Sequence, residues 1–571
     1  MIRRILNHLF LLSALIIATG STAHAADPAA PAPAPEAKEE AKPTPPDKAD
    51  TAWMLVSTGL VLLMVPGLAL FYGGIARRKN LLGTMMHSMI TLGIVGVQWF
   101  LFGYCFAFGA SKGGWIGFTP EYLGLNGVLS DTLFANTTIP VYVHCMYQGM
   151  FAIITPALIS GAVAERIRFL PYCVFVSLWS LLVYTPLAHW VWAIDKSGTP
   201  VGILGSMGAL DFAGGTVVHV AAGVSGLAAI LLLRKRIGFP QQAMHPNSMV
   251  LTLFGAGILW FGWFGFNGGS GLGMGTGIAG AALTATQVAA ASAGLTWTIV
   301  EWIHRKRPTA LGFATGFVAG LVAVTPASGF VPPWAALIIG IVVAVVCYVV
   351  LWLKPKLGYD DSLDAFGVHG VGGFVGAILT GVFASAILYK AGSGADLPPA
   401  TLGGSEVHRV VVQLVAALVA TVFSFVVTAG LVKVIDMTMG FTLKPEDERD
   451  GLDYAVHGEA AFDFGLAAEQ SSAADVPEPR SALVPPSQGN RFTVVLEGGN
   501  NGELMHVWSE LCKASEQPPT SEFRSVYPHV TTVQGNRFRF RGGDPGSISS
   551  NLAKLFEKQL PGRKLVAKVE N

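Results

Sequence analysis

The sequence has few charged residues for its length. Of its 571 residues only 13% are Asp, Glu, Lys or Arg, whereas soluble globular proteins carry about a quarter. The chain is also 52% hydrophobic, and long apolar runs recur along most of it. This composition argues against a soluble protein and predicts an integral membrane protein surrounded by lipid. The net charge of +1 gives no reason to expect a nucleic acid as a partner.

Cysteines and catalytic motifs are equally sparse. The five cysteines are scattered along the chain without the spacing of a metal site or a disulfide framework. We interpret them as small buried hydrophobic residues. The sequence also lacks a recognisable nucleophile–base pair, metal-ligand cluster or cofactor-binding loop. We therefore expect no enzyme activity, no metal and no cofactor.

The N-terminus differs from the rest of the chain. Residues 1–25 have a basic start, a short apolar run and small residues at Ala23 and Ala25. This pattern predicts a secretory signal peptide that is cleaved after Ala25. A first membrane anchor is the alternative, but the apolar run is short for one. Residues 26–51 are rich in proline, alanine and charge, which predicts an extended, unstructured extracytoplasmic leader.

From Trp53 onward, eleven apolar segments are predicted to cross the membrane, of which the eighth is short. Basic clusters such as ARRKN, ERIR and HRKR follow every second segment, and the other loops hold only isolated cations. This alternation predicts a multi-pass protein of the cell (inner) membrane, with the mature N-terminus outside and the C-terminus in the cytoplasm. The approximate limits of the segments are 53–75, 81–108, 138–163, 170–190, 211–233, 247–268, 276–300, 309–328, 333–353, 366–389 and 408–435.

Short motifs recur five segments apart. The third segment contains TPAL and the eighth contains TPAS, while the fifth carries DFAGGTVVH and the tenth carries DAFGVHG. Because five is an odd number, the two halves would be inverted relative to each other. Inverted halves are common in transporters, with the functional site between them near the middle of the membrane. The predicted fold is therefore an all-α polytopic membrane protein with eleven transmembrane helices and inverted five-helix repeats, the eleventh helix lying outside the pair.

Two histidines occupy matching places in these halves. His219 follows Asp211 by eight residues and His369 follows Asp364 by five. Because the two helices enter from opposite faces, we expect both rings near mid-membrane, where an unsatisfied polar side chain is costly. A single such histidine would most simply be structural, but two at matching positions favour a function. We interpret both aspartates mainly as helix caps, although the negative charge of Asp211 could also attract a cation to a nearby external site.

Paired imidazoles suit a small substrate with a labile proton. Neutral rings in an apolar channel cannot compensate the large desolvation cost of a permanent cation, but they can accept and pass a proton. Ammonium has such a proton and potassium has none, so selectivity could come from deprotonation. The pair alone would equally permit a proton or water pathway. Aromatic residues in YQGMF, HWVWA and FGWFGFNGGSG could hold a cation, but their spacing alone is more typical of an interfacial aromatic belt.

Six longer strings narrow these alternatives: ISGAVAERIRF, GALDFAGGTVVH, WFGFNGGSG, AGLVAVTPASG, DAFGVHGVGG and DERDGLDYAVHGEAAF. Together they resemble the ammonium transporter family of the Amt/Mep/Rh type, over roughly residues 52–464. The resemblance implies a membrane domain at 52–440, a cytoplasmic family-type tail at 441–464 and a homotrimer with one pore in each protomer. It also implies that ammonium is recruited outside and deprotonated, that ammonia is conducted inward with a separately relayed proton, and that a PII-type signalling protein can act at the cytoplasmic face.

The resemblance further implies roles for particular residues. His219 and His369 resemble the paired pore histidines of the family. Tyr147 departs from the pattern, since many bacterial relatives have phenylalanine there, and we expect the site to survive with altered affinity. The implied recruitment site consists of Trp192, Ser270, Tyr147 and the supporting Asp211, and the implied phenylalanine gate consists of Phe151 and Phe266.

The last part of the chain is not explained by this family. Residues 465–489 are polar and predict a flexible linker. Residues 490–571 follow the order βαββαβ, which predicts a small ferredoxin-like α/β domain with a cytoplasmic, regulatory function. The alternating Arg537, Arg539 and Arg541 could bind an anion, although a solvated strand face is the simpler interpretation. The domain also leaves an alternative function open, an ammonium sensor that signals through its tail.

Overall fold

The computed structural model describes residues 45–462, 491–497 and most of 530–570, with a few residues between 503 and 526. The chain divides into two compact units, Met1–Phe464 and Gly465–Asn571, and each is described by itself. The predicted signal peptide, most of the predicted leader and the predicted linker lie outside the described residues.

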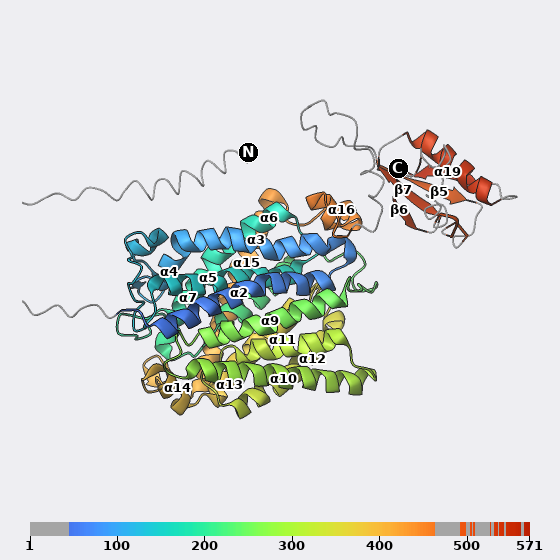
Figure 1. Ribbon diagram of the computed structural model, residues 1–571. Helices are drawn as coiled ribbons and strands as arrows, with labels where there is room; N and C mark the ends of the chain where they lie inside the picture. The colour runs from blue at the N-terminus through green and yellow to red at the C-terminus, as the bar shows by residue number, and fades with distance from the viewer. Residues whose placement is uncertain are drawn as a thin grey trace, which may run out of the picture. The chain divides into compact units, whose positions relative to one another are not determined.

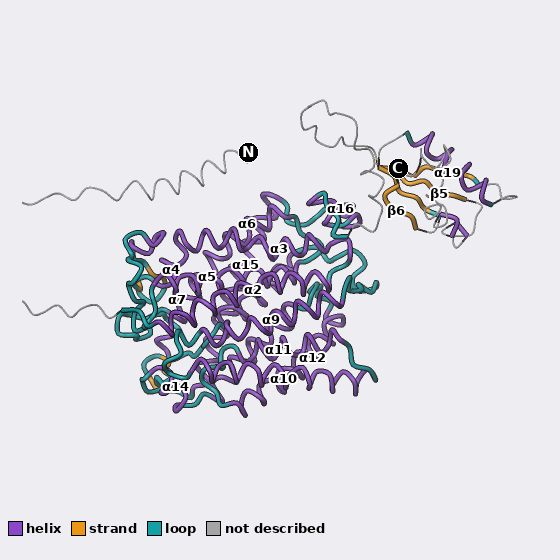
Figure 2. Tube along the Cα trace, in the orientation of Figure 1, coloured by secondary structure: helices purple, strands orange, loops and turns teal. Residues whose placement is uncertain are grey.

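The first unit is a bundle of apolar helices (Figures 1 and 2). Among the described residues, ten helical spans are long and apolar enough to cross a membrane, and α11 (Ala310–Val324) is a shorter apolar helix. The ten spans are α2 (Lys48–Ile75), η1–α3–η2–α4 (Arg78–Phe108), α5 (Val141–Val163), α6–η4–α7 (Phe169–Trp192), η6–α8 (Gly215–Leu232), α9 (Met249–Gly269), α10 (Ile278–Arg305), α12 (Pro333–Leu357), η7–α13 (Phe366–Phe383) and α15 (Arg409–Met439).

Shorter elements connect these helices. Two small antiparallel hairpins are formed by β1 with β2 and by β3 with β4. After α15 the chain continues through α16 and the π-helical η8. The bounds of the shorter elements are β1 (Ser111–Lys112), β2 (Ile116–Gly117), η3 (Pro120–Leu125), η5 (Gly205–Met207), α14 (Ala386–Ser393), β3 (Thr401–Leu402), β4 (Ser405–Glu406), α16 (Pro445–Asp450) and η8 (Asp453–His457).

Several of the approximate segment limits differ from the helix bounds by a few residues, and local structure explains three of these differences. The first helix begins at Lys48, inside the predicted leader, because the side chain of Asp47 accepts hydrogen bonds from the backbone N–H groups of residues 49 and 50. The fifth helix begins at Gly215 and not at residue 211, after Gly214 with a φ of 108°. The tenth ends at Phe383, because Ser385 caps a separate short helix, α14.

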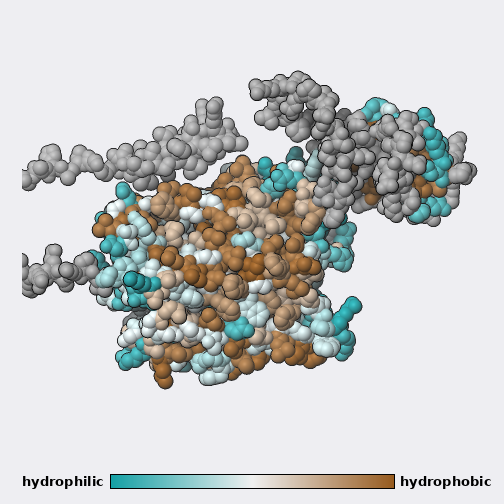
Figure 3. All heavy atoms as spheres, in the orientation of Figure 1, coloured by the Kyte–Doolittle hydropathy of each residue, from teal (hydrophilic) through white to brown (hydrophobic). Residues whose placement is uncertain are grey.

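The surface of this unit matches its composition. Figure 3 shows hydrophobic residues across the middle of the visible face and hydrophilic residues gathered at its two ends. Large apolar side chains on the helices point outward, for example Leu55, Phe254, Ile303 and Val422. A mostly helical, membrane-spanning protein is thereby confirmed, since such a surface is stable only against lipid.

The second unit contains a four-stranded antiparallel sheet in the order β6-β7-β5-β8. Its described elements are β5 (Arg491–Glu497), β6 (Val530–Gln534), β7 (Arg537–Arg541), α19 (Pro545–Gln559) and β8 (Val566–Glu570). Phe538 and Phe540 are buried, whereas the alternating Arg537 and Arg539 are exposed. Arg537 pairs with Glu570 at 2.8 Å, so at least this arginine belongs to a solvated, charge-paired strand face.

Candidate functional site

Two histidines form the centre of the candidate site. The rings of His219 and His369 are stacked, with centroids 5.3 Å apart and 20° between their planes. Their Nδ1 atoms are 3.3 Å apart, a distance at which one ring can donate a hydrogen bond to the other. Both side chains are almost fully buried, and Nε2 of His219 has no hydrogen-bond partner among the described residues. The pair can therefore accept a proton at Nε2 and pass one between the rings.

Two π-helical turns and a glycine crossing bring the histidines together. His219 lies in η6 (Gly215–Val220) and His369 lies in η7 (Phe366–Gly370), and π-helical turns are typical of functional sites. A Cβ atom on Gly223 would lie 2.0 Å from the backbone nitrogen of Gly370, and one on Gly373 would lie 2.9 Å from Cβ of His219. Because only glycine fits at such contacts, the two backbones approach closely enough for the rings to stack.

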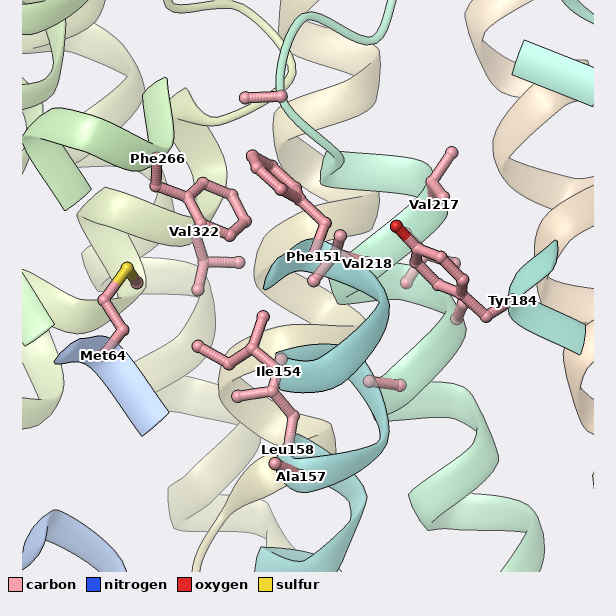
Figure 4. Close-up of a cluster of buried hydrophobic side chains, with 14 of the residues drawn as sticks. Met64, Phe151, Ile154, Ala157, Leu158, Tyr184, Val217, Val218, Phe266 and Val322 are labelled. Atoms are coloured by element: carbon pink, nitrogen blue, oxygen red, sulfur yellow. The ribbon is translucent and has the colours of Figure 1, made fainter. Parts of the chain in front are cut away.

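Aromatic rings continue from the histidines toward one end of the unit. The ring of His219 stacks on that of Trp263, with centroids 5.4 Å apart, and the centroid of the Phe266 ring lies 6.1 Å from that of His219. Phe266 stacks on Phe151 with centroids 4.2 Å apart, and Figure 4 shows these two rings side by side. Trp192 meets Phe151 edge to face at 6.1 Å. Phe151 and Phe266, which were predicted to form a gate, are therefore in contact with each other, and Trp192, which was predicted to take part in recruitment, contacts Phe151.

Three cavities follow one another along this path. The first, called the aromatic cavity, has a volume of about 150 Å³. The second, called the histidine cavity, has only about 10 Å³, close to the space of one water molecule. The third, called the aspartate cavity, has about 20 Å³ and shares Phe71, Val318 and His369 with the second. Phe151 lines the first cavity and Phe266 lines the second, so the stacked pair separates them.

The linings differ in polarity. The histidine cavity is apolar apart from its two imidazoles, and Figure 4 shows Met64, Ile154, Leu158 and Val218 of this lining around the phenylalanine pair. The aromatic cavity combines ring faces with a few polar groups. It is lined by Phe108, Phe134, His144, Gln148, Phe151, Trp192, Ile194, Phe212, Ser270 and Leu272.

Sequence reasoning missed several residues of the aromatic cavity. His144 and Gln148 both line it, and neither was singled out. A signal was present, since His144, Gln148 and Phe151 follow the i, i+4, i+7 spacing of one helix face. The ring of His144 stacks on Phe134 at 3.6 Å, and its Nδ1 lies 3.0 Å from the hydroxyl of Tyr104.

Asp211 acts through the backbone. Its carboxylate accepts hydrogen bonds of 2.6–3.1 Å from the N–H groups of residues 214, 215, 216 and 217. These donors are the orphan N–H groups at the start of the helix that carries His219. The carbonyl oxygen of Asp211 accepts a hydrogen bond of 2.8 Å from the indole of Trp192. Asp211 therefore caps the helix and positions Trp192.

Asp364 is not the cap that its position before the tenth helix predicted. Asp361 accepts the N–H groups of Ala365 and Phe366, at 3.1 and 2.8 Å. Asp364 instead has a φ of 62°, forms an ion pair with Lys354 and lines the aspartate cavity. The left-handed backbone at residue 364 explains the difference, because the chain turns there before the helix begins.

Tyr147 is also placed differently from its expected position in the recruitment site. It is fully buried and does not line the aromatic cavity. Its hydroxyl lies 2.7 Å from the carbonyl oxygen of Phe266 and 3.2 Å from Oγ of Ser270. Tyr147 therefore contacts the end of α9 behind the cavity, while Ser270 lines the cavity itself.

A buried ion cluster joins the loops at the opposite end of the unit. Glu165, with a φ of 71°, pairs with Arg236 at 2.9 Å and with Arg77 at 3.0 Å. Asp360 pairs with Arg236 and Arg166, at 2.7 and 2.8 Å. Burial alone would raise the pKa of Glu165, but the guanidinium groups of Arg236 and Arg77 lower it to about 2. Apart from the basic loops, no pattern in the sequence predicted this cluster.

Comparisons with known proteins show the family of this chain. The Ammonium Transporter Family matches residues 52–462. An "Ammonium transporter" of Bacillus subtilis is 45% identical over 72% of this chain and 98% of its own length. An "Ammonium transporter" of Aquifex aeolicus is 43% identical over 73% and 94%.

Solved structures show the same likeness. The crystal structure of Saccharomyces cerevisiae Mep2 has a TM-score of 0.64 and 34% identity, covering 77% of this chain and 95% of its own. A structure titled "Sensor Amt Protein" has a TM-score of 0.64 and 30% identity, covering 71% and 98%. The resemblance found in the sequence is thereby confirmed. With its paired histidines and aromatic cavity, this chain belongs to the ammonium transporter family.

Proposed function

We propose that the protein transports ammonium across the membrane and conducts it as ammonia past the two histidines. The observation that carries this proposal is the stacked pair of His219 and His369 in an apolar cavity of about 10 Å³. Such a space is too small for a hydrated ion, and an isolated cation there would lose several kcal/mol of solvation. A neutral molecule formed by deprotonation escapes this cost, and potassium has no such route.

The aromatic cavity is the proposed site of recruitment. Trp192 and Phe151 present ring faces that attract a cation, and Ser270 adds a hydroxyl oxygen. The stacked rings of Phe151 and Phe266 form the proposed gate between this cavity and the histidines. Asp211 supports recruitment by holding the indole of Trp192 through its carbonyl oxygen. The proton left by ammonium passes along the histidine pair.

The test is a current measurement on the whole protein. Purified protein is reconstituted in liposomes, and the current is recorded after an ammonium jump, with an equal potassium jump as control. A current for ammonium and none for potassium is expected for electrogenic transport. If no current appears, uptake of ammonia followed by an internal pH dye separates neutral conduction from no transport. Absence of both from folded protein would refute the proposal.

The membrane arrangement is part of the same proposal. We infer eleven transmembrane helices, with α11 counted as the eighth, in two inverted five-helix halves followed by α15. Support comes from the two π-helical turns that carry the histidines in η6 and η7. The aromatic cavity faces outward, the mature N-terminus follows a cleaved signal peptide and lies outside, and the protein forms a homotrimer. Edman sequencing tests the cleavage of the signal peptide, cysteine labelling of loops tests the orientation in the membrane, and native mass spectrometry tests the homotrimer.

The C-terminal unit is proposed to be a cytoplasmic, ferredoxin-like regulatory domain. The antiparallel strand order β6-β7-β5-β8 supports that topology. Deleting residues 465–571 tests the role: we expect transport to persist, and its regulation by nitrogen status or by a PII-type protein to change. A sensor that signals through this domain is less well supported than a transporter, since a receptor needs a binding site but no paired histidines beyond it.

A further inference from the structure

The hydroxyl of Tyr147 does not face the aromatic cavity but the last turn of α9. It lies 2.9 and 2.7 Å from the carbonyl oxygens of Gly265 and Phe266, and 3.2 Å from Oγ of Ser270. A phenol has one proton, so it can donate to only one of these acceptors at a time. The shortest distance assigns that donation to the carbonyl oxygen of Phe266.

This carbonyl lies at the helix end, where it loses the backbone N–H partner that a continuing helix would supply. The N–H of Ser270, which would bond it in a continuing helix, bonds instead to Asn267 and Gly268. The carbonyl of Gly268 accepts from the N–H of residue 271 and from the indole of Trp53, and that of Gly269 accepts from the N–H of residue 272. The carbonyl of Phe266 is therefore an orphan of the helix end, and two side-chain hydroxyls satisfy it, Tyr147 at 2.7 Å and Ser270 at 2.9 Å.

The bond joins the two helices that carry the stacked rings. Tyr147 lies one turn from Phe151 on α5, and its ring meets that of Phe151 at 5.0 Å. Its acceptor is the backbone of Phe266 itself, on α9. The hydrogen bond therefore sets the distance between the two backbones at the level of the phenylalanine pair.

We propose that Tyr147 is a positioning residue that clamps α5 to the end of α9 and so restricts how far the Phe151–Phe266 pair opens, making the pair more selective for the smallest substrate. This inference rests on the proposed transport function. It differs from a role in recruitment, because Tyr147 is fully buried and outside the lining of the aromatic cavity. The hydroxyls of Tyr147 and Ser270 both donate to the carbonyl of Phe266, so Oγ of Ser270 keeps its lone pairs for an N–H donor in the cavity.

The test compares Tyr147→Phe with wild type in the full-length protein. Losing one buried hydrogen bond to a carbonyl that keeps a second donor should raise the ratio of methylammonium to ammonium transport about 2- to 10-fold. The ammonium concentration for half-maximal transport should hardly change. Tyr142→Phe is the matched control, since the hydroxyl of Tyr142 on the same helix donates to the carbonyl of Val128, away from the gate. An unchanged ratio, or a shift in half-saturation alone, would overturn the clamp in favour of a recruitment role.

A second measurement does not depend on transport. Hydrogen–deuterium exchange of a peptide covering residues 265–272 should be faster in Tyr147→Phe than in wild type and in Tyr142→Phe. Ser270→Ala combined with Tyr147→Phe should accelerate it more than either change alone, because the carbonyl of Phe266 then loses both donors. Unchanged exchange in Tyr147→Phe refutes the clamp whether or not the protein conducts, whereas wild-type protein that conducts no ammonium refutes only the proposed function.

Discussion

His219 and His369 are 150 residues apart in the chain, yet their Nδ1 atoms are 3.3 Å apart and their rings are stacked. Both rings line an apolar cavity whose volume is close to the space of one water molecule. Two properties of the proposed pore therefore depend on one contact: its narrowness and its ability to take up a proton.

Replacing either histidine should disturb transport more than folding. In His219→Ala or His369→Ala the proton acceptor is lost and the cavity widens, so a larger cation can enter. We expect ammonium currents to fall or to lose selectivity against potassium, measured by ammonium and potassium jumps on reconstituted protein. Gel filtration and thermal unfolding serve as controls for folding. Wild-type currents with unchanged selectivity in both variants would show that the pair relays no proton.

Trp192→Leu should weaken recruitment. Removing the ring face takes away a cation–π interaction of about 0.5–2 kcal/mol, which corresponds to a rise of about 2- to 30-fold in the half-saturating ammonium concentration. The maximal rate should change less, because the gate and the histidines are untouched. Trp115→Leu is the control, since Trp115 is largely exposed and is not among the residues lining the cavity. An unchanged concentration dependence would remove Trp192 from the recruitment site.

Asp211→Asn should lower stability. Asparagine has one acceptor oxygen where the carboxylate uses two, and its amide would face the N–H groups of Thr216 and Val217. We expect the free energy of unfolding to fall by about 2–4 kcal/mol, because these hydrogen bonds to a charged group are buried. Asp195→Asn, at an exposed turn, should change it much less. The thermal unfolding midpoints of both variants, measured in detergent, test this expected difference.

Glu165→Gln should destabilise the loop cluster and do so in a pH-dependent way. The change leaves Arg236 and Arg77 without their shared carboxylate, and breaking a buried pair costs about 3–5 kcal/mol. Because the pKa of Glu165 is lowered to about 2, its contribution is fully present above the ordinary carboxyl pKa of about 4.3 and is lost as the pH falls toward 2.

Thermal unfolding from pH 7 to pH 3 tests this expectation. The difference between wild type and Glu165→Gln should be constant from pH 7 to about pH 5 and should shrink below about pH 4. Glu497→Gln is the control, because Glu497 forms an exposed pair with Lys568 and such pairs contribute little. A difference that grows on acidification would contradict the ion-pair explanation.

Much of the fold could be predicted from local sequence. The span of α9 (Met249–Gly269) differs from its predicted limits of 247–268 by two residues or fewer, because apolar length and loop charge are properties of short stretches. The candidate residues His219, His369, Trp192, Ser270, Phe151 and Phe266 were also within reach, through matching motifs and family strings. The residues missed, His144 and Gln148, followed a helical spacing that many lipid-facing or core residues share.

The sequence by itself thus determined that this chain lies in a membrane, where its apolar helices run, and to which family it belongs. Only the tertiary structure decided what the side chains contact. The histidine rings meet because Gly223 and Gly370 let two distant backbones cross. Asp361 and not Asp364 caps η7, because the backbone of Asp364 has a left-handed φ. The hydroxyl of Tyr147 reaches a carbonyl on α9 instead of the cavity. The capping result depends on the backbone conformation of a single residue. The histidine and tyrosine contacts depend on where a second, sequence-distant backbone lies, and no local pattern of residues encodes that position.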